Sequence, residues 1–249
     1  MHTEGREYTL KPLETDPNSV LALVGDIGTL RASSRLVHFL KQCNDRGFRK
    51  VFYVLGNHEA YHEDINLYIN KYRELLATNG LTNVVLLENE TYDFPEERVR
   101  FIGTTLWTDC NKDNWFFYQA IKDRMNDFHL ITNGMHRLTP QKSYEFFNKA
   151  AGYIKAVCSN TDDEWKKVLL CHHGVTMQSV PPKFKGDALN HAFVSELSQE
   201  LVDWGIDLCV HGHTHHSVDY MVGDKCRVVS NQVGYYKENP NFVDKVVEI

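Results

Sequence analysis

The chain has 249 residues, of which 42% are hydrophobic and 24% charged, and its formal net charge is −6. These values are ordinary for a globular protein, and the acidic balance argues against a generally basic nucleic-acid-binding surface. No apolar run approaches the roughly 20 residues that span a bilayer, and the N-terminus lacks the basic start and apolar stretch of a secretory signal. We therefore expect a cytoplasmic protein without a membrane partner.

Short apolar runs alternate with amphipathic stretches in the first part of the chain. The runs predict strands at 20–25, 50–56, 84–89 and 98–107, and the amphipathic stretches predict helices at 33–46 and 64–77. Strands that alternate with helices are typical of βαβ units and a parallel sheet.

The remainder is less regular. Residues 108–140 indicate an irregular or short-helical excursion, and 175–187 a long loop. Further elements are expected as helices at 141–159 and 187–204, as strands beginning at 166 and 206, and as β-structure in VDYMVG, CRVVSNQ and the final KVVEI. Since no internal repeat or linker interrupts this order, residues 1–249 are expected to form a single α/β domain.

Four of the expected strands end in residues suited to metal chemistry. LALVG leads into Asp26, FYVLG into Asn57-His58-Glu59, VLLC into His172-His173, and DLCV into the histidine-rich run 211–216. The carboxyl ends of parallel strands lie on one edge of a sheet, where ligand crevices form. The pattern therefore predicts one cleft that gathers Asp26, Asn57, His172, His213 and His215.

These residue types suit a dinuclear metal site. Imidazole together with carboxylate and amide oxygens can bind Mn, Fe or Zn, and a carboxylate such as Asp26 can bridge two ions. Two ions about 3.5–4 Å apart can clamp both the attacking and the leaving oxygen of a phosphoryl group. The chemistry predicted is phosphoester hydrolysis by a metal-bound hydroxide, with no protein nucleophile.

The motifs GDIG, GNHE, CHHG and GHTHH, in this order, resemble the calcineurin-like metallophosphoesterase family from about Val20 to Gln232. Segments such as TTLWTD, MNDFHLI and the closing ENPNFVDKVVEI look like a bacterial branch of that family. The resemblance implies a four-layer α-β-β-α sandwich of two mixed β-sheets flanked by helices, with the metal site at strand ends.

The resemblance also assigns roles. Asp26 would bridge both metals, and Asn57, His172 and His213 would complete one position. His215 would serve the other position, together with the Asp and His of an N-terminal D-x-H motif. His58 would donate a proton to the leaving group or stabilise its developing charge.

The sequence departs from the family at that D-x-H motif. His2 lies 24 residues before Asp26, a separation that suits the motif's histidine, but the Asp would fall before Met1. The sequence is then a truncated or mis-started form, or the protein works with a weakened site. Because a terminal residue such as His2 is expected to be mobile, we expect one tightly held metal and one weak or empty position.

Several other residues are weaker candidates. His173 and His211 either touch substrate or simply pack, and Arg124, Lys183 and Lys185 either contact phosphate or are routine surface charges. Residues that follow the last strand could line the cleft, namely Asn231, Tyr235 and Tyr236.

Three alternative functions remain. His58-Glu59-Ala60-Tyr61-His62 matches the zinc-protease signature H-E-x-x-H, but that signature requires a helix, and here it follows a strand and a Gly-Asn turn. A metallo-β-lactamase type of hydrolase carries its H-x-H-x-D-H run early, whereas the histidine run here is late and lacks the Asp. A catalytically weakened binding or scaffold protein of the same fold is the third alternative. Substrate identity and oligomeric state cannot be inferred from the sequence.

Overall fold

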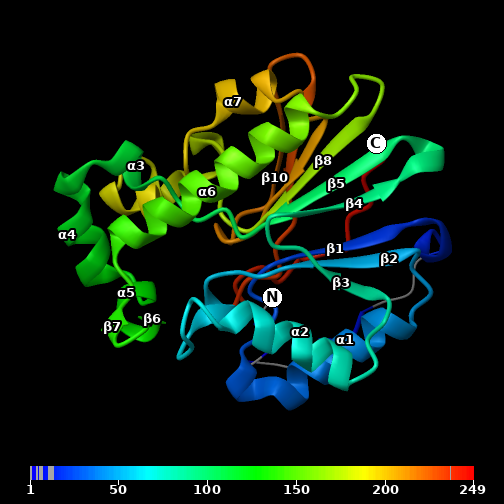
Figure 1. Cartoon of the computed structure of the whole chain (residues 1–249), viewed down its shortest axis with the longest axis horizontal. Coiled ribbons are helices and arrows are strands. Elements are labelled where there is room, and N and C mark those ends of the chain that lie inside the picture. Colours follow the sequence, from blue (N-terminus) through cyan, green and yellow to red (C-terminus); the bar gives the residue numbers. More distant parts are fainter. Residues whose placement is uncertain (1, 4, 6–7, 11–13, 236) are drawn as a thin grey trace.

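The computed structural model describes residues 2–3, 5, 8–10, 14–235 and 237–249. Its smaller sheet has the strand order β1-β2-β3, and both pairs are parallel. These strands are β1 (Val20–Val24), β2 (Lys50–Val54) and β3 (Val84–Leu86). Helices α1 (Ser33–Asp45) and α2 (Tyr68–Thr78) cover the outer face of this sheet (Figure 1).

The larger sheet has six strands in the order β10-β11-β9-β8-β5-β4. Its inner pairs are parallel, whereas both edge pairs are antiparallel. The strands are β4 (Glu90–Phe94), β5 (Val99–Thr104), β8 (Lys166–Cys171), β9 (Leu208–Val210), β10 (Val218–Val222) and β11 (Cys226–Ser230). Helices α6 (Pro140–Ser159) and α7 (Ser198–Asp203) cover its outer face (Figure 1).

The two sheets pack face to face between the two helical layers, which confirms the four-layer α/β fold predicted from the sequence. Only the larger sheet is mixed, because the described strands of the smaller one are all parallel. Alternating side chains of each strand serve different layers. Phe52 and Val54 of β2 pack toward the larger sheet, whereas Val51 and Tyr53 pack toward the helices. Burial of each such side chain stabilises the fold by about 1.5–3 kcal/mol.

The predicted excursion lies at one end of the molecule (Figure 1). It contains α3 (Cys110–Asp113), α4 (Trp115–Arg124), α5 (Asp127–Leu130) and a short hairpin of β6 (Thr132–Asn133) and β7 (His136–Arg137). Thr139 caps α6 by accepting a hydrogen bond from Lys142 N–H, and Pro140 occupies the first helical turn. Residues 108–140 thus contain three short helices and a hairpin, which is the short-helical excursion predicted from the sequence.

Two sequence predictions of local structure are wrong, and one strand was missed. The continuous helix at 187–204 is absent: a 3-10 turn at Ala188–Ala192 is followed by extended backbone that pairs with Gly174, and only then by α7. The final KVVEI forms no strand, although Val247 packs against the core between the sheets. Strand β4 was missed: the apolar run was read as one strand at 84–89, whereas the chain turns at Asn89, with φ +52°, and β4 begins at Glu90. Within the described residues, no helix is long and apolar enough to cross a membrane.

Candidate metal centre

The strand ends deliver their polar residues to one place. Asp26 follows β1, Asn57 follows β2, His172 follows β8, and His213 follows β9. Ligand atoms converge in two groups that share Asp26: one with His172 and His213, the other with His2 and His215. Within each group the ligand atoms all lie within 4.8 Å of one another. The structure therefore brings together the whole residue set that the sequence predicted to bind metal.

The first group is fully buried. His172 Nε2 lies 3.4 Å from Asp26 Oδ1, 3.0 Å from Asn57 Oδ1 and 3.1 Å from His213 Nδ1. The other ring nitrogen of His172 lies 2.9 Å from the carbonyl oxygen of Val24, which fixes the ring orientation. Four donor groups thus face a common point.

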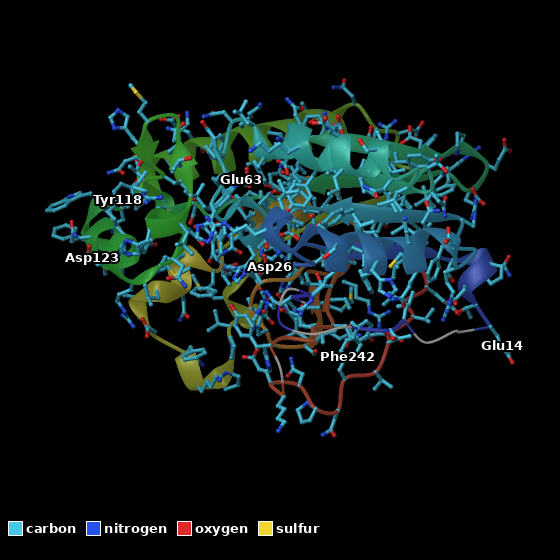
Figure 2. The ribbon with its side chains drawn as sticks, turned by 90° about the horizontal axis from the view of Figure 1, so that it is seen from below. Glu14, Asp26, Glu63, Tyr118, Asp123 and Phe242 are labelled. Atoms are coloured by element: carbon cyan, nitrogen blue, oxygen red, sulfur yellow. The ribbon has the colours of Figure 1, made fainter. Side chains whose placement is uncertain are left out.

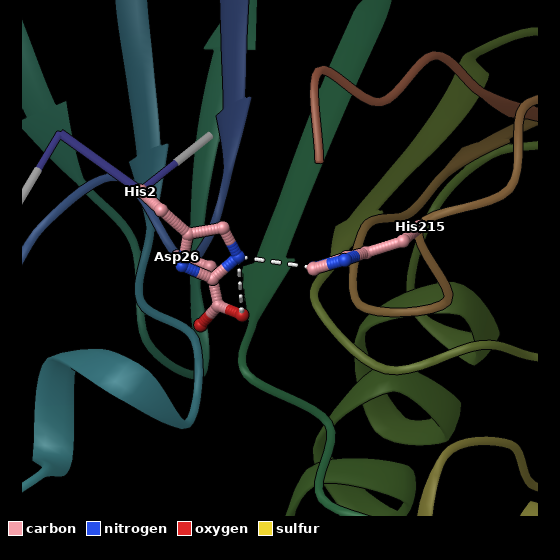
Figure 3. Close-up of side chains that lie close together, drawn as sticks. All are labelled: His2, Asp26 and His215. Atoms are coloured by element: carbon pink, nitrogen blue, oxygen red, sulfur yellow. Dashed lines mark hydrogen bonds and ion pairs between the residues drawn. The ribbon is translucent and has the colours of Figure 1, made fainter. Parts of the chain in front are cut away.

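The second group is built around His2, beside Asp26 and His215 (Figure 3). The His2 side chain is only 3% exposed. Its backbone N–H donates to Asp26 O at 2.7 Å, and the next residue, Thr3, donates to Ile27 O at 2.7 Å. His2 Nε2 lies 3.0 Å from His215 Nε2 and 3.9 Å from Asp26 Oδ2. Backbone pairing with the loop after β1 therefore places the His2 ring in the site, although the residue lies next to the start of the sequence.

The backbone at the site is strained. Asp26, His2, His213 and His215 all have positive φ angles between 50° and 66°. Non-glycine residues rarely adopt this conformation, and each costs on the order of 1–3 kcal/mol. Gly25, which precedes Asp26, has φ +83° and lies so close to His172 that an added Cβ would sit 2.2 Å from its Nδ1. The motif glycines therefore allow the strand ends to approach one another.

The electrostatics of the site favour a cation. Burial by itself raises the pKa of the Asp26 carboxyl. His172 and His58 have the opposite effect and outweigh it, so the pKa lies well below its ordinary value. Burial lowers the pKa of His172, yet Asp26 reverses this and holds it above its ordinary value. Burial also holds the pKa of His213 well below 6.5, so its ring is neutral and can donate a lone pair. A buried carboxylate among converging imidazoles fits a divalent metal ion of the Mn, Fe or Zn type.

Glu59 supports the loop that carries Asp26. This buried carboxylate accepts hydrogen bonds from the backbone N–H groups of Asp26, Ile27, Gly28 and Gly56 at 2.7–3.2 Å, and from the Tyr53 hydroxyl at 2.8 Å. It belongs to the 3-10 turn His58–Ala60, not to a helix interior, and both of its oxygens accept hydrogen bonds from the Asp26 loop, one of them also from Tyr53. The H-E-x-x-H alternative therefore has neither the helix nor the catalytic carboxylate that a zinc protease requires.

Two further carboxylates contact the ligands from outside. Asp127 Oδ1 accepts a hydrogen bond from Asn57 Nδ2 at 2.7 Å, and Glu238 Oε2 lies 2.7 Å from His215 Nδ1. Sequence reasoning missed both of them, since neither follows a strand. The only signal was that each lies in a segment, MNDFHLI or the closing ENPNF run, that resembles the bacterial branch.

His58 lies at the exposed edge of the site. Its backbone N–H donates to Asp26 Oδ1 at 3.0 Å, and its Nε2 lies 4.0 Å from Asp26 Oδ2 and 3.3 Å from the Tyr235 hydroxyl. Its ring packs against Tyr61 at 4.3 Å. Tyr235, half exposed, also stacks on His2 at 4.3 Å. Tyr235 therefore flanks the site.

The weaker candidates from the sequence have the following surroundings in the structure. His173 and His211 are buried behind the ligands, where burial lowers their pKa values to about 3 and about 4. Arg124 pairs with Asp187, and the Lys183 ammonium lies over the Phe184 ring. Asn231 donates to the Val243 carbonyl instead of facing the ligands. Tyr236 lies outside the described residues.

A four-layer α/β sandwich with histidine and carboxylate side chains clustered at its strand ends is the arrangement expected of a metal-dependent hydrolase. The profile of the calcineurin-like phosphoesterases matches residues 6–217. This chain therefore belongs to the calcineurin-like phosphoesterase family.

Several known proteins resemble the chain. An uncharacterized protein of Acanthamoeba polyphaga mimivirus is 27% identical, over 94% of this chain and 85% of its own length. The structure of phosphopantetheinyl hydrolase from Mycobacterium tuberculosis matches with a TM-score of 0.69 and 17% identity, over 90% of this chain and 82% of that one. A dimetal phosphatase from Danio rerio matches with a TM-score of 0.52 and 14% identity, over 85% and 71%. At these identities the two structures support the fold alone.

Proposed function

We propose that this protein hydrolyses phosphomonoester or phosphodiester bonds at a dinuclear metal centre, in which Asp26 would serve both metal positions. The observation that carries the proposal is the pair of ligand groups that share this one carboxylate. Asn57, His172 and His213 would complete the first metal position, and His2 and His215 the second. Mixed nitrogen and oxygen ligands suit manganese, iron or zinc.

The bound metals would supply Lewis acidity, which neutralises phosphate charge and lowers the pKa of water. The chain's own residues supply the rest. Asp26 Oδ1 is held by the His58 backbone N–H, so the carboxylate keeps one orientation. His58 Nε2 lies on the exposed side of Asp26, next to Tyr235, where it can donate a proton to a leaving-group oxygen.

The two metal positions are not equivalent. The first has four protein ligands in this chain, all buried, whereas the second has three, of which His215 is partly exposed. Fewer ligands and more solvent favour dissociation, so we propose that the first position binds metal tightly and the second weakly. Metal analysis of dialysed protein that returned two full equivalents would contradict this.

The test of the proposed function uses Mn²⁺-loaded protein with p-nitrophenyl phosphate and bis(p-nitrophenyl) phosphate. We expect hydrolysis of at least one ester, and loss of that activity in Asp26→Ala and His213→Ala. His136→Ala, which changes an exposed histidine on β7, is the matched control and retains activity. Absence of hydrolysis in the wild-type protein across metals and esters would favour the scaffold function instead.

A further inference from the structure

Asp127 is a buried carboxylate that comes from outside the four strand-end motifs. It is the first residue of α5, within the excursion, and it is 3% exposed. Its Oδ1 accepts hydrogen bonds from Asn57 Nδ2 at 2.7 Å and from the Tyr61 hydroxyl at 2.9 Å. Asn57 belongs to the GNHE motif and Tyr61 lies two residues beyond it, so this side chain links the excursion to the metal centre.

The contact with Asp127 determines which way the Asn57 side-chain amide is turned. Nδ2 faces Asp127, and Oδ1 faces the first metal position, 3.0 Å from His172 Nε2. The two ends of an asparagine amide have nearly the same shape, so sterics alone do not choose between them. Only the oxygen can bind a cation, whereas the NH₂ group, turned toward the metal, would repel it. A carboxylate oxygen at Nδ2 selects the productive orientation, since it accepts hydrogen bonds.

We propose that Asp127 is a positioning residue that orients the Asn57 amide toward the first metal and fixes Tyr61 against His58. This inference rests on the proposed function, because it assumes that Asn57 is a metal ligand. Residues that orient metal ligands in this way typically change metal affinity or activity by about 10–100-fold when they are replaced.

The energetics of burial argue that this carboxylate has a purpose. Burial raises the pKa of Asp127, and the hydrogen bonds from Asn57 and Tyr61 offset this only in part. A buried carboxyl group is costly unless it is paired. The bonds that compensate Asp127 run to Asn57 and to the tyrosine that packs on His58. An apolar residue could attach the excursion to the body without that cost.

The test compares Asp127→Asn with a matched control, Asp123→Asn. Asp123 is an exposed carboxylate of the same excursion and lies on its outer side, away from Asp26 (Figure 2). Isothermal titration calorimetry with Mn²⁺ measures the affinity of the first position. We expect Asp127→Asn to weaken that affinity by about 10–100-fold, and Asp123→Asn to leave it unchanged.

A second variant separates positioning from a purely structural role. In the exchange Asn57→Asp with Asp127→Asn, the new carboxylate at 57 presents an oxygen in either orientation and accepts the hydrogen bond from position 127. We expect the exchange to restore most of the lost Mn²⁺ affinity. Thermal unfolding without metal monitors the fold of each variant.

The outcomes are distinguishable. If the wild-type protein binds no divalent metal, the proposed function fails and this inference fails with it. If the wild-type binds Mn²⁺ and Asp127→Asn binds it equally well, the inference alone is overturned. It is likewise overturned if the single variant binds weakly and the exchanged pair remains equally weak although folded, because Asp127 would then act through something other than the amide.

Discussion

Replacement of Glu59 by glutamine tests how the Asp26 loop is held in place. The carboxylate divides its hydrogen bonds: Oε2 accepts from Asp26 N and Gly56 N, whereas Oε1 accepts from Ile27 N, Gly28 N and the Tyr53 hydroxyl. A glutamine has one carbonyl oxygen and an NH₂ group, which can serve only one of these sets. In either orientation at least two buried donors lose their acceptor and face another donor.

Each buried donor left unsatisfied costs about 1–3 kcal/mol. Two of them give an expected destabilisation of roughly 2–6 kcal/mol for Glu59→Gln, a large fraction of a typical unfolding free energy of about 5–15 kcal/mol. Urea unfolding of metal-free protein at pH 7, followed by circular dichroism, measures this difference. Mn²⁺-dependent esterase activity is expected to fall in parallel, because the Asp26 loop loses its support.

The matched control is Glu90→Gln, which neutralises a half-exposed carboxylate paired with Arg73. An exposed pair of this kind contributes at most about 1 kcal/mol. If Glu59→Gln destabilised the protein no more than this control does, Glu59 would not hold the loop, and the reasoning would be refuted. Peptidase activity that appeared in the wild type and vanished in Glu59→Gln would instead support the protease alternative.

Three further predictions concern the residues around the metals. Gly56→Ala would place a Cβ 2.3 Å from Asp26 Oδ1, so we expect Mn²⁺ affinity to fall at least about tenfold. Unchanged Mn²⁺ binding in calorimetry would contradict the close packing of Gly56 against Asp26. Glu238→Gln removes the carboxylate beside His215 Nδ1, so we expect the metal affinity of the second position to fall by about 10–100-fold and that of the first to stay unchanged. Metal analysis after dialysis measures both, and an equal loss at the two positions would contradict this. Burial lowers the pKa of His211 to about 4, below its unfolded value of about 6.5, so the stability it contributes is present above about pH 6.5 and is lost as the pH falls toward 4. His211→Gln should therefore flatten the pH dependence of urea unfolding between pH 7 and 5, and an unchanged slope would speak against a neutral buried ring.

Sequence reasoning predicted the fold class and assembled the ligand set because both depend on strand ends. An apolar run that stops at Asp26 or His172 indicates a buried strand and a polar residue at its carboxyl end, and parallel pairing then places such residues on one edge. The helix predicted at 187–204 failed for the opposite reason. The hydrophobic periodicity of this segment reflects only neighbouring residues, whereas the backbone at Val194 pairs with Gly174, which is distant in the chain. A sequence pattern within one segment contains no information about such a tertiary contact.

His2 shows how tertiary pairing can bury a residue near the start of the sequence. A residue next to a terminus is usually mobile, because few contacts restrain it. Here two backbone hydrogen bonds to the loop after β1 extend from His2 and Thr3, and the His2 ring lies between Asp26, His215 and Tyr235. The histidine is therefore buried by partners that the sequence alone does not place beside it.

The two carboxylates that contact the proposed ligands, Asp127 and Glu238, were not predicted from the sequence. Asp26 is recognisable because it ends a strand, but Asp127 begins a four-residue helix and Glu238 lies in a segment without regular structure. Their role depends on which atom of a ligand they touch, and that contact exists only in the folded chain. In the proposed centre the motifs would supply the metal-facing atoms of Asn57 and His215, whereas the excursion and the C-terminal segment supply carboxylates to their opposite ends. Changes to these two segments in this chain would therefore be expected to alter metal affinity even when every proposed ligand is retained.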